Sequence, residues 1–76
     1  MPVGSYTATL FADGKKRIAQ KVGEEAVELA IAAQYPDKKR VIEETADLVY
    51  HMLVLLAESD VELNDVYVEL AGRMKK

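Results

Sequence analysis

The fold is decided by residues 15–58, which read KKRIAQKVGEEAVELAIAAQYPDKKRVIEETADLVYHMLVLLAE. On both sides of Pro36, apolar residues recur at intervals of three and four, which is typical of amphipathic helices. Pro36 cannot continue a helix, and Asp37 is a natural N-cap for the next one. The sequence therefore predicts helices over about 15–33 and 38–58, joined by a short loop into a central antiparallel hairpin.

The segments that flank this hairpin also have helical patterns. Ser5 is a plausible N-cap for a short helix over residues 6–12, which Gly14 would end, and we expect residues 1–4 to be disordered or lightly tethered. Asn64 is a plausible N-cap for a fourth helix over about 65–74. No strand-like alternation persists, so we expect one all-α domain of four helices over residues 1–76.

Composition excludes several classes of protein and site. The chain has no cysteine and one histidine, which excludes disulfides and zinc sites built on several imidazoles. A net charge of −3 argues against nonspecific nucleic-acid binding. The longest nearly apolar run, residues 50–57, is far shorter than the roughly 18 residues that span a membrane, and no secretory signal is visible. We expect a cytoplasmic protein without nucleic-acid or membrane partners.

The helix over residues 38–58 is too apolar for a chain of this size to cover. Residues 50–57 are apolar nearly all round, and such a helix must be buried on several sides. A 76-residue chain builds only a small core of its own. We therefore expect a homodimer, or a larger homo-oligomer, with this helix at the interface.

Four carboxylates lie in or beside the apolar stripes of the predicted hairpin: Glu25, Glu28, Glu44 and Asp47. Glu28 and Glu44 are equally far from Pro36 along the chain, and so are Glu25 and Asp47. In an antiparallel hairpin each of these pairs lies at one height. The sequence therefore predicts two carboxylates of one helix facing two of the other, unless these acids form a solvated helix face on which Lys21 pairs with Glu25.

Such a cluster of oxygens suits a hard divalent cation. Magnesium is the natural ion and manganese a possible substitute, because only oxygen ligands are offered. Magnesium usually shares its shell with substrate phosphates. The predicted cluster therefore points to chemistry on a nucleotide or a polyphosphate.

These carboxylates also form a known motif. Glu24-Glu25-x-x-Glu28, a gap of fifteen residues and Glu44-x-x-Asp47 resemble the EExxE…ExxD signature of all-α nucleotide pyrophosphohydrolases, the MazG-like superfamily. The wider context resembles the phosphoribosyl-ATP pyrophosphohydrolase family from Ser5 onward, over residues 5–8, 20–28, 44–51 and 63–70. The resemblance implies a MazG-like fold completed by dimerisation, with active sites near the subunit interface. Members usually carry a further helix before the Ser-Tyr-Thr segment, which four residues precede here; the chain is either a short member or trimmed.

The family's reaction is the second step of histidine biosynthesis. With magnesium, its members hydrolyse the α–β phosphoanhydride of phosphoribosyl-ATP to phosphoribosyl-AMP and pyrophosphate. The resemblance thus implies a nucleotide substrate, a magnesium ion on Glu25, Glu28, Glu44 and Asp47, and a general base among these carboxylates or at Glu24. Two other functions stay open: a MazG-like house-cleaning nucleoside triphosphate pyrophosphohydrolase, and a catalytically silent helical dimerisation module.

Several neighbouring residues have both a functional and an ordinary reading. Lys21, and Lys15 in the basic opening of its helix, would bind phosphate or remain solvated. The hydroxyl groups of residues 5–7, which are Ser5, Tyr6 and Thr7, could contact substrate. His51 could support the metal site by a hydrogen bond to the Asp47 carboxylate, or be a satisfied core residue. Gly23 would permit close approach by a helix or by substrate, or reflect neutral drift.

Overall fold

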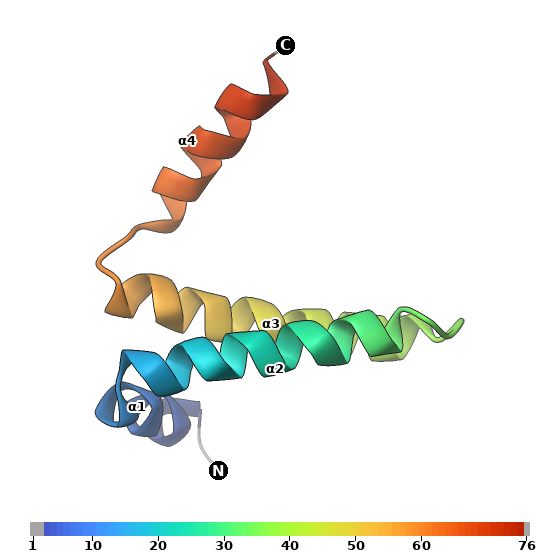
Figure 1. The fold of residues 1–76 in the computed structure, drawn as a ribbon, viewed down its shortest axis with the longest axis horizontal. Coiled ribbons are helices and arrows are strands. Elements are labelled where there is room, and N and C mark those ends of the chain that lie inside the picture. Colours follow the sequence, from blue (N-terminus) through green and yellow to red (C-terminus); the bar gives the residue numbers. More distant parts are fainter. Residues whose placement is uncertain (1–2, 76) are drawn as a thin grey trace.

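The computed structural model describes residues 3–75 and confirms the all-α prediction. Its four helices are α1 (Val3–Asp13), α2 (Lys15–Ala32), α3 (Lys38–Glu58) and α4 (Leu63–Met74). Figure 1 shows α2 and α3 side by side as a long hairpin, with α1 folded against its open end and α4 projecting away from it. The hairpin is therefore the element that positions any site on this chain.

The boundaries of the hairpin lie close to the predicted ones. Asp37 caps α3 as expected, because its carboxylate accepts a hydrogen bond from the Arg40 backbone N–H at 3.2 Å. At the other side of the turn, α2 ends at Ala32 and Ala33 forms its C-cap, one residue earlier than predicted. Pro36 lies in the turn between them, as its inability to continue a helix requires.

The start of α1 differs from the prediction. Val3 and Gly4 are already helical, so the expected disorder is wrong for both, and Ser5 lies inside the helix instead of capping it. The Ser5 carbonyl accepts a hydrogen bond from Thr9 Oγ1 at 3.0 Å, a local bond one helical turn long. Residues 1 and 2 of the same prediction lie outside the described residues.

Gly14 ends α1 as predicted and also starts α2. Its φ of 95° lies in a region that L side chains rarely adopt, so a glycine is required at this corner. Its N–H donates to the Leu10 carbonyl at 3.2 Å, and its own carbonyl accepts from the Ile18 N–H at 3.1 Å. One residue thus closes one helix and opens the next, which lets α1 fold back onto the hairpin.

The predicted cap of α4 is wrong. The helix begins at Leu63 and is capped by Glu62, whose backbone N–H donates to the Asp65 carboxylate at 3.0 Å while its own side chain accepts from the Asp65 backbone. This capping box satisfies two donors at once, whereas Asn64 would have satisfied one. Because this reciprocal pair caps the helix at Glu62, α4 begins two residues earlier than predicted.

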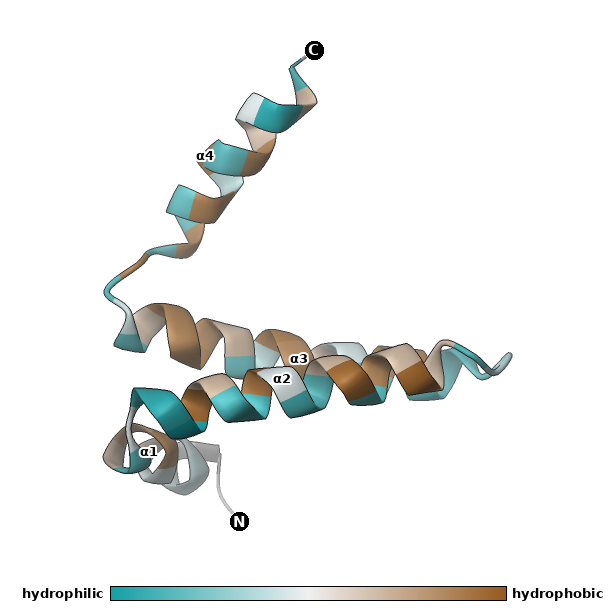
Figure 2. Cartoon of the chain, in the orientation of Figure 1, coloured by the Kyte–Doolittle hydropathy of each residue, from teal (hydrophilic) through white to brown (hydrophobic). Residues whose placement is uncertain are grey.

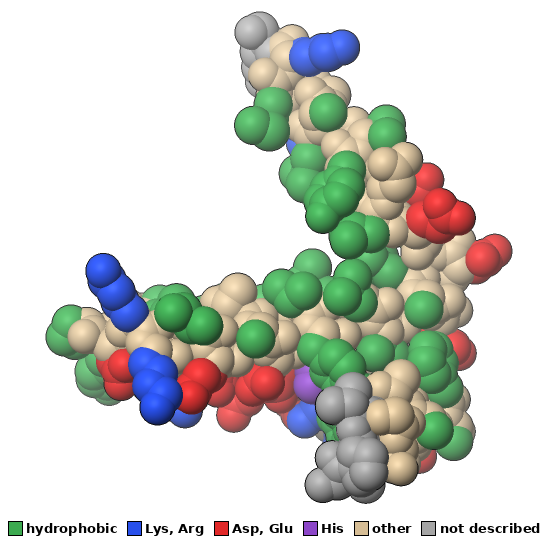
Figure 3. Space-filling model, turned by 180° about the vertical axis from the view of Figure 1, so that it is seen from behind, with side chains coloured by type: hydrophobic (Ala, Val, Ile, Leu, Met, Phe, Trp, Pro, Cys, Tyr) green, Lys and Arg blue, Asp and Glu red, His purple; other side chains and the backbone are tan. Residues whose placement is uncertain are grey.

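The core is small and lies where α1 meets the hairpin. Leu10, Ile18 and Val54 are its buried members, and Tyr6, Tyr50 and Leu55 pack against it. Large apolar side chains remain exposed on α3 and α4, among them Met52, Leu53, Tyr67 and Leu70. Figure 2 shows apolar residues along both helices, and in Figure 3 hydrophobic side chains gather on α4 and on the hairpin edge that it faces.

The chain by itself therefore leaves part of the apolar surface of α3 uncovered, as its composition led us to expect. None of the helices in the described range 3–75 combines the length and apolar character that a membrane span requires.

Candidate metal centre

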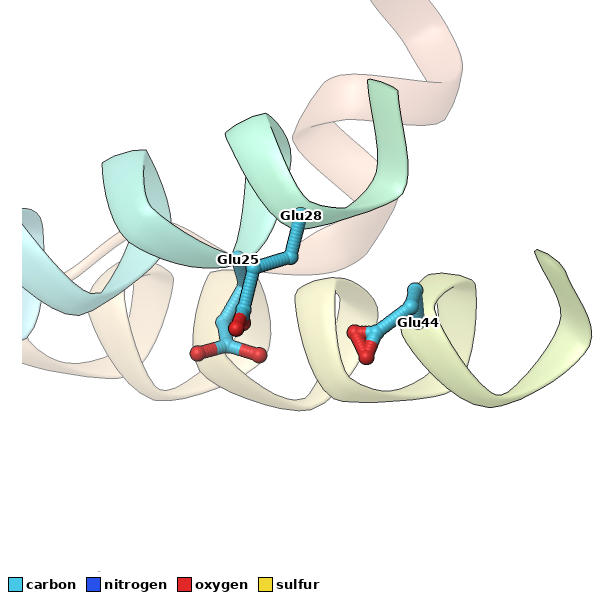
Figure 4. Close-up of side chains that lie close together, drawn as sticks. All are labelled: Glu25, Glu28 and Glu44. Carbon is cyan, nitrogen blue, oxygen red and sulfur yellow. The ribbon is translucent and has the colours of Figure 1, made fainter. Parts of the chain in front are cut away.

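Three carboxylates converge across the hairpin. Glu25 and Glu28 from α2 and Glu44 from α3 each offer an oxygen, and these three oxygens all lie within 4.8 Å of one another. Figure 4 shows the three side chains directed toward one region between the two helices. Glu25 and Glu44 are each 7% exposed, whereas Glu28 is exposed. The structure therefore brings together three of the four carboxylates that the hairpin register had placed opposite each other.

The electrostatics of this carboxylate cluster favour a cation. The negative charges of Glu25 and Glu44 raise the pKa of Glu28 above its ordinary value. Glu44 Oε2 is buried and has no hydrogen-bond partner among the described residues. A buried oxygen without a partner is costly, and a bound cation would satisfy it. The donor set consists of carboxylate oxygens, so it fits magnesium or manganese.

Asp47 lies outside this cluster. It is exposed on α3, one turn after Glu44, and was predicted to face Glu25. An aspartate side chain is one methylene shorter than a glutamate, so it reaches less far across the hairpin. Glu25 also reaches toward Lys21, whose Nζ lies 3.4 Å from its Oε2.

Two cations flank the carboxylate cluster. Lys21 Nζ lies 3.4 Å from Glu25 Oε2 and 3.4 Å from Glu24 Oε1, and Arg40 Nη2 lies 3.9 Å from Glu44 Oε1. Burial acts to lower the pKa of Lys21, but its hydrogen bond to Glu25 and nearby negative groups outweigh that effect and raise the pKa. Lys21 therefore carries its charge beside the carboxylates. Lys15 is exposed at the start of α2, six residues before Lys21.

Glu24 is held by partners that the sequence analysis did not assign. Gln20 Nε2 donates to Glu24 Oε2 at 2.9 Å, and Arg17 Nη1 lies 4.0 Å from the same oxygen. The hydrogen bond from Gln20, followed by Lys21 and Arg17, lowers the pKa of this exposed carboxylate. The spacings of four and seven residues before Glu24 place both partners on its helix face, which is the signal that could have identified them.

An open hollow of about 670 Å³ lies beside the cluster. Its lining comprises Gln20, Lys21, Gly23, Glu24, Glu25, Val27 and Glu28. A Cβ built on Gly23 would meet nothing within 4 Å, so no other described segment of this chain approaches that residue closely. The hollow is of a size that small-molecule sites commonly have.

The predicted partner of His51 is wrong. Its Nδ1 lies 2.7 Å from the backbone carbonyl of Asp47, and not on the carboxylate. Its Nε2 lies 2.8 Å from the Tyr6 hydroxyl. The ring is 6% exposed and both nitrogens have partners, so His51 is a satisfied core residue in this chain.

The three expected hydroxyl donors of α1 are in different environments. Ser5 is exposed, Tyr6 is directed to His51, and Thr7 Oγ1 is hydrogen-bonded to the Tyr50 hydroxyl. Tyr6 and Thr7 thus attach α1 to α3. The structure does not assign either hydroxyl group to a ligand.

Comparison with known proteins gives a consistent result. The family model described as phosphoribosyl-ATP pyrophosphohydrolase matches residues 1–74. A phosphoribosyl-ATP pyrophosphatase of Metallosphaera sedula is 55% identical over 75 residues, which are 99% of this chain and 81% of that protein. A histidine biosynthesis bifunctional protein of Vibrio cholerae is 58% identical over 74 residues, which are 97% of this chain and 35% of that protein.

A bifunctional protein of the same description from Pasteurella multocida is 56% identical over 75 residues, which are 99% of this chain and 37% of that protein. The chain thus spans about a third of the length of these bifunctional relatives and most of the length of the Metallosphaera sedula protein.

Proposed function

The chain belongs to the phosphoribosyl-ATP pyrophosphohydrolase family, and we propose that it hydrolyses the α–β phosphoanhydride of phosphoribosyl-ATP to phosphoribosyl-AMP and pyrophosphate. The observation that carries this proposal is the carboxylate cluster of Glu25, Glu28 and Glu44, in which the buried Glu44 Oε2 has no hydrogen-bond partner within residues 3–75. A role in histidine biosynthesis is supported by the names of the relatives.

Magnesium would be held by Glu25, Glu28 and Glu44, with Asp47 as a further ligand from the next turn of α3. When bound, the ion supplies positive charge that polarises the phosphoryl group and stabilises the pyrophosphate that leaves. Manganese fits the same oxygen donors. A bound ion would favour the ionised form of Glu28 most directly, because the negative charges of neighbouring glutamates raise the pKa of this carboxyl group.

The residues of α2 carry the remaining roles. Lys21 keeps its charge beside Glu24 and Glu25, and we assign it to a phosphate oxygen of the substrate. Glu24 has an exposed carboxylate that is ionised at neutral pH, and we assign it to accept a proton from the attacking water, although its lowered pKa makes it a weaker base. Glu25 is the alternative base, since it lies in the cluster itself. Lys15 would meet the distal end of a polyphosphate.

The active unit is proposed to be a homodimer in the cytoplasm. The exposed apolar side chains of α3 and α4 support a second copy as their cover.

The test is an assay of pyrophosphate release from phosphoribosyl-ATP with magnesium. A parallel reaction contains chelator, and ATP, dCTP and dUTP serve as competing substrates. We expect magnesium-dependent release from phosphoribosyl-ATP alone. Release from the other nucleotides would instead favour a house-cleaning pyrophosphohydrolase, and no release from any by a folded protein would favour a silent helical module.

A further inference from the structure

A second hollow lies where α2, the turn of the hairpin and α3 meet, at the right of Figure 1. We call it the turn hollow. Its volume is about 310 Å³, and its lining comprises Ile31, Ala32, Tyr35, Asp37 and Arg40. This volume is at the small end of the range for ligand sites, and none of the lining residues has a role in the proposed function.

The turn hollow continues the seam between α2 and α3 that carries the carboxylate cluster. Ala32 follows Glu28 by four residues in α2. Arg40 precedes Glu44 by four residues in α3, and its Nη2 lies 3.9 Å from Glu44 Oε1. Four residues of helix rise about 6 Å, so the hollow and the cluster are neighbours on one face. The short side chain of the buried Ala32 leaves space on this seam that a longer one would fill.

The walls of the turn hollow suit a flat heteroaromatic ring. Tyr35 is 66% exposed, and among residues 3–75 no other ring stacks on it, whereas Tyr6 and Tyr50 stack on each other. Ile31 is 56% exposed and adds an apolar surface. Arg40 adds a planar guanidinium, which packs well on aromatic faces. An aromatic ring, an apolar side chain and a planar cation together fit the faces of a nucleobase.

The backbone of the turn holds these groups in place before a ligand arrives. The Tyr35 N–H donates to the Ala32 carbonyl at 3.3 Å, and the Tyr35 carbonyl accepts from the Asp37 N–H at 2.8 Å. The Asp37 carboxylate accepts from the Arg40 backbone N–H at 3.2 Å. The three polar or aromatic residues of the hollow thus belong to one hydrogen-bonded turn, which lowers the entropy cost of binding.

The position of the phosphates sets the direction of the rest of the nucleotide. In the proposed function, Lys21 and Lys15 bind the polyphosphate on the side of the cluster that is nearer the start of α2. The nucleoside then extends the other way, toward the turn. A ribose separates the α-phosphate of a nucleotide from its base, which suits a hollow one helical turn from the metal ligands. The Asp37 carboxylate would repel a phosphate there but would accept a hydrogen bond from an amino group of a base.

We propose that the turn hollow binds the purine base of phosphoribosyl-ATP, with the base against the Tyr35 ring and the Arg40 guanidinium. The proposal rests on the proposed function, which supplies the direction of the nucleotide. It makes Tyr35 and Arg40 residues that recognise the base, whereas the carboxylate cluster acts on the phosphates.

The first experiment locates the base directly. Isotope-filtered nuclear Overhauser spectra are recorded on ¹³C-labelled protein saturated with phosphoribosyl-AMP and magnesium. We expect contacts from the H2 and H8 protons of the base to the Tyr35 ring and to the Ile31 methyl groups. Contacts to the methyl groups of Val27 instead would place the base in the larger hollow beside the cluster and would overturn the proposal.

The second experiment measures the contribution of the Tyr35 ring by calorimetric titration in magnesium. Tyr35→Ala should weaken the binding of phosphoribosyl-AMP roughly 10-fold and leave the binding of inorganic pyrophosphate unchanged. Tyr35→Phe keeps the ring and should bind both ligands as the wild-type protein does. Unchanged affinity for phosphoribosyl-AMP in Tyr35→Ala, or an equal loss for pyrophosphate, would contradict a base site.

A matched pair of isoleucines serves as the control. Ile31 and Ile42 are both exposed, but Ile42 lines a neighbouring hollow on the other side of the turn and not the turn hollow. Ile31→Ala should weaken the binding of phosphoribosyl-AMP roughly 5-fold or more, and Ile42→Ala should not change it. The opposite result would move the base to the neighbouring hollow and refute the assignment.

Arg40→Lys separates a base from a phosphate as the occupant. Lysine keeps the positive charge beside Glu44 but lacks the planar guanidinium. We expect phosphoribosyl-AMP to bind roughly 10-fold more weakly, and ribose 5-phosphate to bind as it does to the wild-type protein. A loss confined to ribose 5-phosphate would identify the turn hollow as a phosphate site, against the proposal.

The proposal and the proposed function fail separately. If the wild-type protein releases no pyrophosphate from phosphoribosyl-ATP, the proposed function is wrong, yet titration with AMP and magnesium still reads the base site. AMP binding that Tyr35→Ala weakens roughly 10-fold and Tyr35→Phe preserves would support the base site even then. A wild-type protein that binds neither AMP nor phosphoribosyl-AMP would overturn it.

Discussion

Among single residues, Glu28 gives the most direct test of whether the carboxylate cluster binds a cation. The charges of Glu25 and Glu44 raise the pKa of Glu28, so its ionised form is disfavoured in the folded chain. We expect Glu28→Gln to raise the melting temperature in the presence of chelator, because the substitution removes that repulsion. The same variant should lose the stabilisation that magnesium gives the wild-type protein, and its kcat/KM should fall on the order of 100-fold or more.

Thermal unfolding with magnesium and with chelator measures both effects. Glu43→Gln is the matched control, because Glu43 is an exposed glutamate of α3 outside the carboxylate cluster. It should respond to magnesium as the wild-type protein does. A Glu28→Gln variant that is still stabilised by magnesium would remove Glu28 from the ligand set.

The pH dependence of stability follows from the same shift. A carboxyl group whose pKa is higher in the folded than in the unfolded chain binds more protons when folded, so its contribution to stability falls as pH rises. The fall begins near the ordinary glutamate value of 4.5 and continues through the raised pKa of the folded state. In chelator, the stability advantage of Glu28→Gln over wild type should therefore grow as pH rises from about 4.5 to 7.

Urea unfolding at several pH values measures this difference. Comparing the variant with wild type isolates Glu28 from Glu24, whose lowered pKa acts in the opposite direction and favours the folded state above 4.5. A difference that shrinks with rising pH would mean that Glu28 is not repelled in the folded chain.

At the scale of the elements, Gly14 at the N-cap of α2 and Gly23 within α2 should respond to alanine substitution in opposite ways. Gly14 has a φ of 95°, so Gly14→Ala should destabilise the fold by about 1–2 kcal/mol. Gly23 lies within α2 with nothing within 4 Å of a built Cβ, so Gly23→Ala should stabilise the fold by about 0.5–1 kcal/mol. Because Gly23 also lines the hollow beside the cluster, the stabilised variant should bind phosphoribosyl-ATP less tightly.

Denaturant unfolding and the KM for phosphoribosyl-ATP test this pair of substitutions together. Gly72→Ala, at another helical glycine with open space around its Cβ, is the control for propensity without a nearby hollow. It should stabilise the protein without changing KM. A Gly23→Ala variant with unchanged KM would place the substrate away from this part of α2.

The N-terminus of α4 offers a second test at this scale. Asp65→Ala breaks the capping box with Glu62 and should cost about 1 kcal/mol of helix stability, which amide hydrogen exchange in α4 would report. Asn64→Ala is the matched control, because Asn64 lies inside the helix and should tolerate alanine. Faster amide exchange in Asn64→Ala than in Asp65→Ala would contradict the capping box and would favour Asn64 as the cap, as the sequence predicted.

At the scale of the whole molecule, the exposed apolar surface of α3 and α4 is the main unsatisfied feature. Sedimentation at micromolar concentration should give twice the mass of the chain if a second copy covers this surface. Leu70 is 47% exposed on α4, and Leu70→Asp should shift the protein toward the monomer. Asn64→Asp adds the same charge to the start of the same helix and should leave the dimer intact; a monomeric wild-type protein would remove the dimer from the proposal.

The sequence by itself determined the features that depend on local periodicity and on distance from the turn. Helical spacing, Pro36 and the Asp37 cap specify the hairpin, and equal distances from Pro36 specify that Glu28 and Glu44 meet across it. The motif that contains them, together with the wider sequence context, was enough to identify the family.

Tertiary structure decided what depends on the reach of a side chain and on competition between partners. The shorter side chain of Asp47 lies outside the cluster of the other three carboxylates. The capping box of Glu62 and Asp65 is local, but its competition with Asn64 decided where α4 begins, because a reciprocal pair satisfies two donors. His51 contacts the Asp47 carbonyl and not its carboxylate, and its second nitrogen contacts Tyr6 of α1. Contacts between segments 45 residues apart in the chain have no period that a sequence pattern could reveal.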